Sequence, residues 1–211
     1  LDDDTIAEIC SQIKIATEMG VQVAIVCGGG NFWRGRSGEN MDRTRADHMG
    51  MLATVINSIG MKDALVRAGL DAHVMTPVMM ETFTEPYLCD KAVEYLEKGS
   101  VVILAGGSGA PFFSTDTGAV LRAAEIKADA ILLAKNIDGV YSADPMKDPT
   151  AVKYDRITYD EVLAQHLMVM DTTATSLSMD NHIPVLVFAL KDPYNIVRAL
   201  RGEKIGTIVK E

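Results

Sequence analysis

The chain has 211 residues, enough for one domain whose folding buries about 70% of the unfolded surface. With 48% hydrophobic and 23% charged residues, the composition is that of a globular protein. No apolar run reaches the ~18–20 residues of a membrane span, and the first residues are acidic where a signal peptide would be basic. We therefore expect neither a membrane protein nor a secreted one.

The net charge of −9 makes nucleic acid an unsuitable partner, because binding to it depends on many Lys and Arg contacts with phosphates. A small anion can still bind where backbone N–H groups, an arginine or Mg²⁺ reverse the local field. The three cysteines are far apart and form no C-x-x-C pair. This usage predicts reduced thiols and a cytoplasmic protein.

Apolar spacing predicts alternating helices and strands in the first half of the chain. A first helix is expected to end at Gly20, and the β-branched run at residues 21–27 is typical of a buried parallel strand. A long helix is expected at 42–68, a strand at 71–76 and a helix at 88–98.

The alternation continues in the second half. Helices are expected at 116–126, 159–165, 172–181 and 194–201, and strands at 100–105, 130–134, 184–188 and, as an edge strand, 207–209. This order predicts an α/β fold with three α/β/α layers and a mainly parallel central sheet. No linker interrupts it, so we expect one domain covering residues 1–211.

Two glycine-rich loops follow predicted strands, at residues 28–31 and 106–115. Ligands of open α/β sheets bind beyond the carboxyl ends of the strands, and glycine-rich loops present backbone N–H groups to anions. The second loop leads into a helix for which Ser114 or Thr115 is a plausible N-cap, and a helix N-terminus attracts phosphate. Two such loops in one sheet favour a site for a phosphoryl ligand over simple tight turns.

Common nucleotide and hydrolase motifs are absent. There is no P-loop, and both G-x-G-x-x-G matches fail, because Trp33 and Phe112 occupy their last positions. Arg34, directly after the first loop, is a candidate phosphate clamp. Asp47 is a candidate acceptor for ribose hydroxyls. Asp171 is either the N-cap of the following helix or an active-site residue, and the sequence leaves both open.

Several segments resemble the bacterial uridylate (UMP) kinase family of the amino acid kinase superfamily. The resemblance covers nearly the whole chain and lies in segments 28–35 (GGGNFWRG), 41–54 (MDRTRADHMGMLAT), 111–117 (PFFSTDT), 138–145 (DGVYSADP), 169–171 (VMD) and 202–207 (GEKIGT). The long segment around Asp47 separates this family from members that form acylphosphates.

The resemblance implies phosphorylation of UMP to UDP by ATP with Mg²⁺, in pyrimidine nucleotide biosynthesis. It also implies a homohexamer that GTP activates and UTP inhibits. By matching position, the UMP site would consist of Gly29, Asp47, Ser108, Gly109, Ala110, Pro111, Phe112, Phe113, Ser114 and Thr115. The ATP site would consist of Gly30, Arg34, Lys135, Tyr141 and Asp144, and the catalytic residues would be Arg34, Asp116 and Asp171. No metal-ligating cluster is expected in the protein itself.

The chain departs from the family pattern at two places. Ala110 stands where the family has asparagine, which removes a side-chain hydrogen bond. The family's N-terminal strand with a Lys-x-Ser-Gly motif is absent, so we expect a segment before Leu1 to be missing. Three alternatives stay open: a superfamily member that phosphorylates a carboxylate or carbamate, a non-catalytic nucleotide sensor, and an unrelated Rossmann oxidoreductase.

Overall fold

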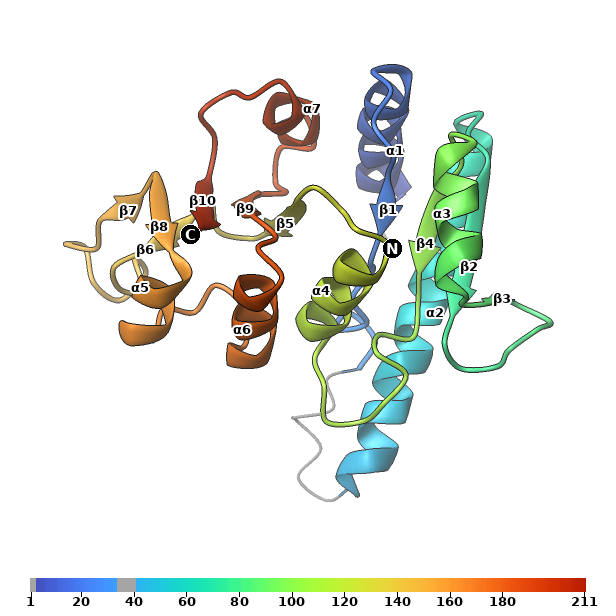
Figure 1. The fold of residues 1–211 in the computed structure, drawn as a ribbon, viewed down its shortest axis with the longest axis horizontal. Helices are drawn as coiled ribbons and strands as arrows, with labels where there is room; N and C mark the ends of the chain where they lie inside the picture. Colours follow the sequence, from blue (N-terminus) through green and yellow to red (C-terminus); the bar gives the residue numbers. More distant parts are fainter. Residues whose placement is uncertain (1–2, 34–40) are drawn as a thin grey trace. The chain divides into compact units, whose positions relative to one another are not determined.

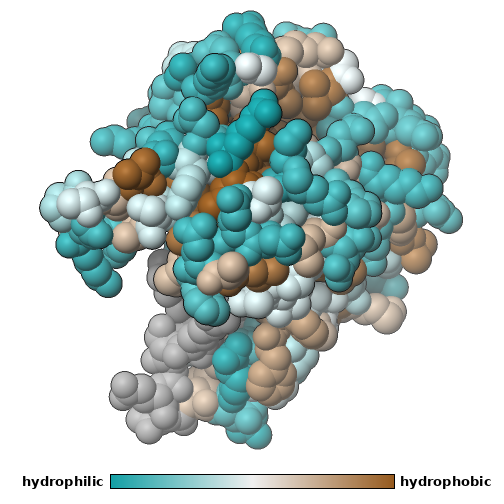
Figure 2. Space-filling model, turned by 60° about the vertical axis from the view of Figure 1, so that its left-hand side comes forward, coloured by the Kyte–Doolittle hydropathy of each residue, from teal (hydrophilic) through white to brown (hydrophobic). Residues whose placement is uncertain are grey.

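The computed structural model describes residues 3–33 and 41–211 (Figure 1). The chain divides into two compact units, Leu1–Arg122 and Ala123–Glu211, each with its own four-stranded sheet. Arg34, the expected phosphate clamp, lies outside the described residues. Within the described residues, no helix is long and apolar enough to span a membrane. The face in Figure 2 is mostly hydrophilic, with hydrophobic residues in small groups.

The first unit contains a fully parallel sheet with the strand order β1-β4-β2-β3. Its elements are α1 (Asp3–Glu18), β1 (Ala24–Ile25), α2 (Arg43–Arg67), β2 (Ala72–Thr76), β3 (Glu85–Pro86), α3 (Cys89–Glu97), β4 (Val101–Leu104) and most of α4 (Thr115–Glu125), whose last three residues belong to the second unit. Every residue of β4 is buried, which requires cover on both faces of the sheet. Val101 and Ile103 pack with residues of α1 and α2, while α3 also packs against β4.

The first strand is shorter than the sequence predicts. The apolar run at residues 21–27 predicts a buried strand, but β1 contains only Ala24 and Ile25, of which Ala24 is exposed and Ile25 half-buried. Among the described strands, β1 pairs with β4 alone. The other edge of β1 has no partner strand in this part of the chain, so no second row of backbone hydrogen bonds stabilises a longer strand.

The second unit contains a mixed sheet with the order β5-β9-β10-β8 and a separate hairpin of β6 and β7. Its elements are β5 (Ile131–Lys135), β6 (Val140–Tyr141), β7 (Lys153–Tyr154), β8 (Arg156–Thr158), α5 (Tyr159–Ala164), α6 (Thr172–Asp180), β9 (Val185–Ala189), α7 (Asn195–Leu200) and β10 (Thr207–Lys210). Strand β9 is parallel to β5 and antiparallel to β10.

Strand β10 corrects the expectation of an edge strand at residues 207–209. It lies between β9 and β8, and Val209 is fully buried. The sequence hides its second neighbour because β8 has three residues, too few for an apolar period to appear. Gly206 brings β10 close to β9, since a Cβ at this position, where φ is +65°, would lie 2.0 Å from the carbonyl oxygen of Val187.

Candidate functional site

The two glycine-rich loops border one pocket of about 400 Å³ in the first unit. They follow β1 and β4, which are parallel neighbours, so their carboxyl ends meet at one edge of the sheet. The first loop contributes Gly29, Gly30 and Trp33; helix α2 contributes Arg43, Asp47, Gly50, Met51 and Thr54; the second loop and the start of α4 contribute Gly106, Gly107, Ser108, Ala110, Phe113, Ser114 and Thr115.

The first loop is held against helix α2. The side-chain amide of Asn57 donates to the carbonyl oxygen of Gly28 at 2.6 Å and to Oδ1 of Asn31 at 2.7 Å. Gly29 lies so close to the helix that a Cβ there would be 2.8 Å from the carbonyl oxygen of Gly50. Only glycine allows this approach, and the loop backbone therefore forms one wall of the pocket.

The second loop has an unusual backbone that other elements support. Gly106, Gly107 and Gly109 have φ values of +75°, +58° and +83°, and Phe112 has +73°. The N–H of Gly106 donates to Oγ1 of Thr54 on α2 at 2.8 Å. Because a positive φ in a residue other than glycine costs about 1–3 kcal/mol, the conformation of Phe112 must be imposed by its contacts.

Asp47 supplies that contact. Its Oδ2 accepts hydrogen bonds from the backbone N–H of Phe112 and from Nε of Arg43, both at 2.8 Å. The Arg43 guanidinium also lies over the Phe112 ring, 5.4 Å from its centroid. The Asp47 side chain is 13% exposed, so most of the carboxylate is shielded from water, while the Arg43 side chain is 39% exposed. Asp47 thus ties the second loop to α2 and faces the pocket.

The N-terminal turn of α4 borders the same pocket. The hydroxyl of Ser114 accepts a hydrogen bond from the N–H of Thr117 at 3.0 Å, which confirms Ser114 as the N-cap. Ser114 and Thr115 both line the pocket, and Asp116 follows in the first turn of the helix. The positive end of the helix dipole at this turn favours a negatively charged ligand.

In the second unit, Lys135 is the last residue of β5 and Tyr141 lies in the β6–β7 hairpin. The Tyr141 hydroxyl donates to Oδ1 of Asp138 at 2.8 Å, and Lys153 donates to Oδ2 at 2.9 Å. The hydrogen bond from Lys153 lowers the pKa of Asp138, and the bond to Asp138 raises the pKa of Tyr141. Lys153 and the Tyr141 hydroxyl are therefore both fixed on a single ionised carboxylate.

Asp144 and Asp171 both hold backbone N–H groups. Asp144 accepts from the N–H of Met146 at 3.0 Å in the turn between β6 and β7. Asp171 is the N-cap of α6 and accepts from the N–H of Ala174 at 2.9 Å. The capping role that the sequence left open for Asp171 is thus confirmed, while a role in chemistry stays a prediction.

Sequence reasoning missed Arg43, Thr54 and Asn57, which orient the two loops. Together with Asp47 and Gly50, these residues follow one another at intervals of four, three, four and three residues along α2. Such spacing places side chains on one face of a helix. This spacing is present in the sequence and is the signal that could have identified Arg43, Thr54 and Asn57.

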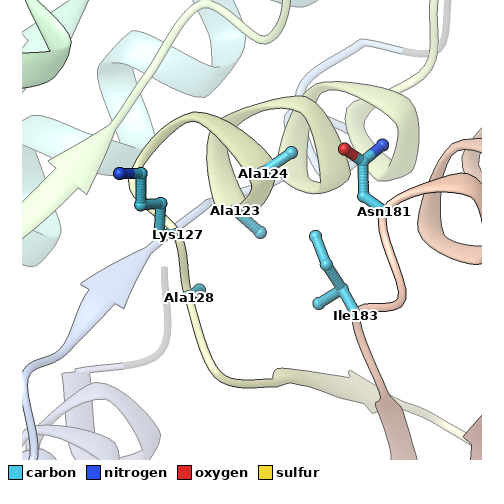
Figure 3. A pocket seen from close by; sticks show the side chains of 6 residues that line it. All are labelled: Ala123, Ala124, Lys127, Ala128, Asn181 and Ile183. Atoms are coloured by element: carbon cyan, nitrogen blue, oxygen red, sulfur yellow. The ribbon is translucent and has the colours of Figure 1, made fainter.

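A second hollow, of about 250 Å³, lies in the second unit (Figure 3). It is bordered by Ala123, Ala124, Ala128 and Ile183, with Lys127 and Asn181 as its polar side chains. This lining lacks the convergent polar groups of the first pocket. Within the described residues, no three acidic, histidine or cysteine side chains are grouped to hold a metal ion.

Comparison with known proteins identifies the family. The model of the amino acid kinase family matches residues 1–191. The structure of UMP kinase from Bacillus anthracis is 37% identical, with a TM-score of 0.94 over 97% of this chain and 86% of that protein. UMP kinase from Ureaplasma parvum is 38% identical, with a TM-score of 0.93 over 98% and 88%. Uridylate kinase from Archaeoglobus fulgidus is 29% identical, with a TM-score of 0.78 over 99% and 93%.

These matches also confirm the expected α/β architecture with mainly parallel strands. On this evidence, the chain belongs to the amino acid kinase family and is similar, over nearly its whole length, to the UMP kinases within it.

Proposed function

We propose that this protein transfers the γ-phosphoryl group of ATP to UMP, giving UDP and ADP, in pyrimidine nucleotide biosynthesis. The observation that carries the proposal is the pocket between the two glycine-rich loops, which joins backbone N–H groups, Asp47 and the positive end of α4. The proposal is supported by 37–38% identity to proteins described as UMP kinases.

Gly29, Asp47 and residues 108–115 would hold UMP. A ribose hydroxyl that donates to Asp47 would join, or compete with, the two donors on Oδ2, so ribose binding and the position of the second loop would be linked. Ala110 offers only its backbone to the base. The N-terminal turn of α4 and the loop N–H groups would face the phosphate of UMP.

By matching position with the family, and not from the arrangement of the two units, Gly30, Arg34, Lys135, Tyr141 and Asp144 would hold ATP. Mg²⁺ would enter with ATP, because this ion is usually bound by nucleotide phosphates and keeps several of its waters. When bound, Mg²⁺ would neutralise part of the phosphate charge. Asp116 and Asp171 would orient the cationic groups near the transferred phosphoryl group.

The transfer needs little covalent help from the protein. A phosphate oxygen of UMP forms a bond to the γ-phosphorus while the bond from that phosphorus to the bridging oxygen breaks, and ADP leaves with the electron pair. The attacking oxygen is already ionised, so no strong general base is needed. Catalysis depends on positioning and on a local positive field, which Arg34 and the loop N–H groups would supply in a chain of net charge −9.

We also propose that residues 1–211 act as one domain of a cytoplasmic homo-oligomer, a hexamer by the family resemblance. Helix α2 exposes an apolar stripe of Met49, Leu52, Ile56 and Ile59, each 39–50% exposed. An apolar stripe of this kind is typical of protein interfaces. Light scattering on the parent and on Ile56→Glu tests the assembly, and a monomeric parent would contradict it.

The family resemblance also implies activation by GTP and inhibition by UTP, and titrating each nucleotide into the activity assay tests these two effects.

An ADP-release assay on the full-length protein tests the activity, with UMP, CMP and dUMP as acceptors. We expect UMP to be the best acceptor. N-acetylglutamate, aspartate and carbamate serve as controls, and preference for one of them would replace this proposal with an acylphosphate-forming or carbamate activity. Calorimetric binding of UMP without turnover would indicate a nucleotide sensor instead. Binding of NAD(H) without phosphoryl transfer would indicate an oxidoreductase.

A further inference from the structure

Arg122 on α4 is a buried arginine outside the pocket lining. Its exposed fraction is 5%, and its guanidinium carbon lies 4.1 Å from the centroid of the Tyr87 ring. Burying a guanidinium is unfavourable unless it meets hydrogen-bond acceptors. The position of those acceptors therefore indicates what this side chain holds in place.

Two of the acceptors belong to the second glycine-rich loop. Nη2 of Arg122 donates to the carbonyl oxygens of Gly107 and Ser108, each at 3.4 Å. Gly107 and Ser108 line the pocket. Since the peptide group is planar, fixing the direction of a carbonyl also fixes the following N–H. Arg122 thus acts on the orientation of two consecutive peptide groups in the wall of the pocket.

Gly118 allows this contact. A Cβ at Gly118 would lie 3.0 Å from both Cα and the carbonyl carbon of Gly107, so α4 approaches the loop as closely as glycine permits. Arg122 follows four residues later and lies on the same face of the helix. The guanidinium reaches the loop from this face and has the Tyr87 ring against it. Its planar fork can stack and donate at once, which the single ammonium of lysine cannot do.

We propose that Arg122, supported by Tyr87, is a positioning residue for the acceptor nucleotide: it holds the peptide groups of Gly107 and Ser108 in the conformation that binds UMP. This inference rests on the proposed function, in which the second loop contacts UMP. The residues proposed for ATP lie mainly in other segments of the chain. Loss of Arg122 should therefore weaken use of UMP much more than use of ATP.

The test measures both KM values and kcat of the full-length protein with Arg122→Met and Arg122→Lys. Arg67→Met is the matched control, since Arg67 is an exposed arginine of α2 that pairs with Asp63 outside the pocket. We expect both Arg122 variants to raise the KM for UMP about 10- to 100-fold and to change the KM for ATP less than about 2-fold. The control should match the parent. Hydrogen exchange at residues 106–112, measured without nucleotide, should be faster in Arg122→Met than in the parent.

A purely structural role would give a different result. An unchanged KM for UMP in Arg122→Met, an equal rise of both KM values, or full recovery in Arg122→Lys would each overturn the inference. If Arg122→Met does not fold, Tyr87→Leu decides, because it removes the stacking partner and keeps the guanidinium; a parent-like KM for UMP in that variant would refute the inference. If the parent does not phosphorylate UMP, the proposed function fails, while the hydrogen exchange still shows whether Arg122 orients the loop.

Discussion

Replacing Gly29 with alanine places a Cβ 2.8 Å from the carbonyl oxygen of Gly50 and 2.9 Å from Cβ of Ala53. Both neighbours belong to the rigid helix α2, so the glycine-rich loop must move. Carbon atoms pack at about 3.5–4.0 Å, and the loop would have to retreat by roughly half an ångström or more. The hydrogen bonds that Asn57 makes to this loop oppose such a shift.

The expected cost follows from the crowding. Inserting a methyl group into a packed site destabilises a protein by about 1–3 kcal/mol, or roughly 2–12 °C in Tm for a chain of this size. We expect the substitution to affect catalysis more strongly than stability. A displacement of about 1 Å can lower a rate about 100-fold, so we expect kcat/KM for UMP to fall about 10-fold or more.

Gly28→Ala is a matched control, because a Cβ at this neighbouring position meets nothing within 4 Å and neither glycine has a left-handed φ. Urea unfolding can be followed by the fluorescence of Trp33, the single tryptophan of the chain, which lines the same pocket. We expect Gly28→Ala to match the parent in both measurements. Equal unfolding midpoints and equal kcat/KM for the two variants would refute the steric argument.

Three further outcomes are expected. Asp47→Ala should reduce the preference for UMP over dUMP, measured as a ratio of kcat/KM values, because a site built around a ribose hydroxyl rejects ligands that lack it; an unchanged ratio would exclude the ribose role. Arg34→Ala should lose about 2–4 kcal/mol of transition-state stabilisation with little change in urea midpoint; near-normal kcat/KM would disprove its role. Burial alone would raise the pKa of Glu85, but hydrogen bonds from Lys91 and Tyr95 hold it at about 2, below its ordinary 4.5. The ionised Glu85 carboxylate therefore stabilises the fold fully above pH 4.5, and this contribution is lost as the pH falls toward 2. Glu85→Gln should lose less free energy of unfolding over that pH range than the parent. Identical acid unfolding curves for the two proteins would contradict this role of Glu85.

The helices could be predicted from signals between residues that are close in the sequence. Helix α2 was expected at residues 42–68 and is observed as Arg43–Arg67, with Asp42 as its N-cap. The cap and the apolar period both depend on residues within one or two turns of each other, so they can be read from the sequence. The start of α4 was expected at Ser114 or Thr115 for the same reason, and the structure shows Ser114 as the cap.

Short strands were not predictable. Strand β3, the β6–β7 hairpin and β8 were not expected from the sequence, and each of these strands has only two or three residues. A strand this short has too few side chains to show a period of two, and it persists only because a partner elsewhere in the chain satisfies its backbone. The same reason explains why β10 was expected at an edge and lies inside the sheet.

For the candidate site, the sequence by itself determined which segments carry glycines, which residues are candidates to cap the helices, and that two loops follow predicted strands. The tertiary structure made those two strands, β1 and β4, neighbours. Only the tertiary structure decided which side chains reach those loops. Thr54 contacts Gly106, Asp47 contacts Phe112 and Arg122 contacts Ser108, at separations of 52, 65 and 14 residues. The physical reason is that this loop, with several left-handed residues, satisfies only some of its polar groups by itself, as in the bond from Gly109 N–H to the Gly106 carbonyl. Its shape therefore also depends on donors and acceptors from helices that packing brings close.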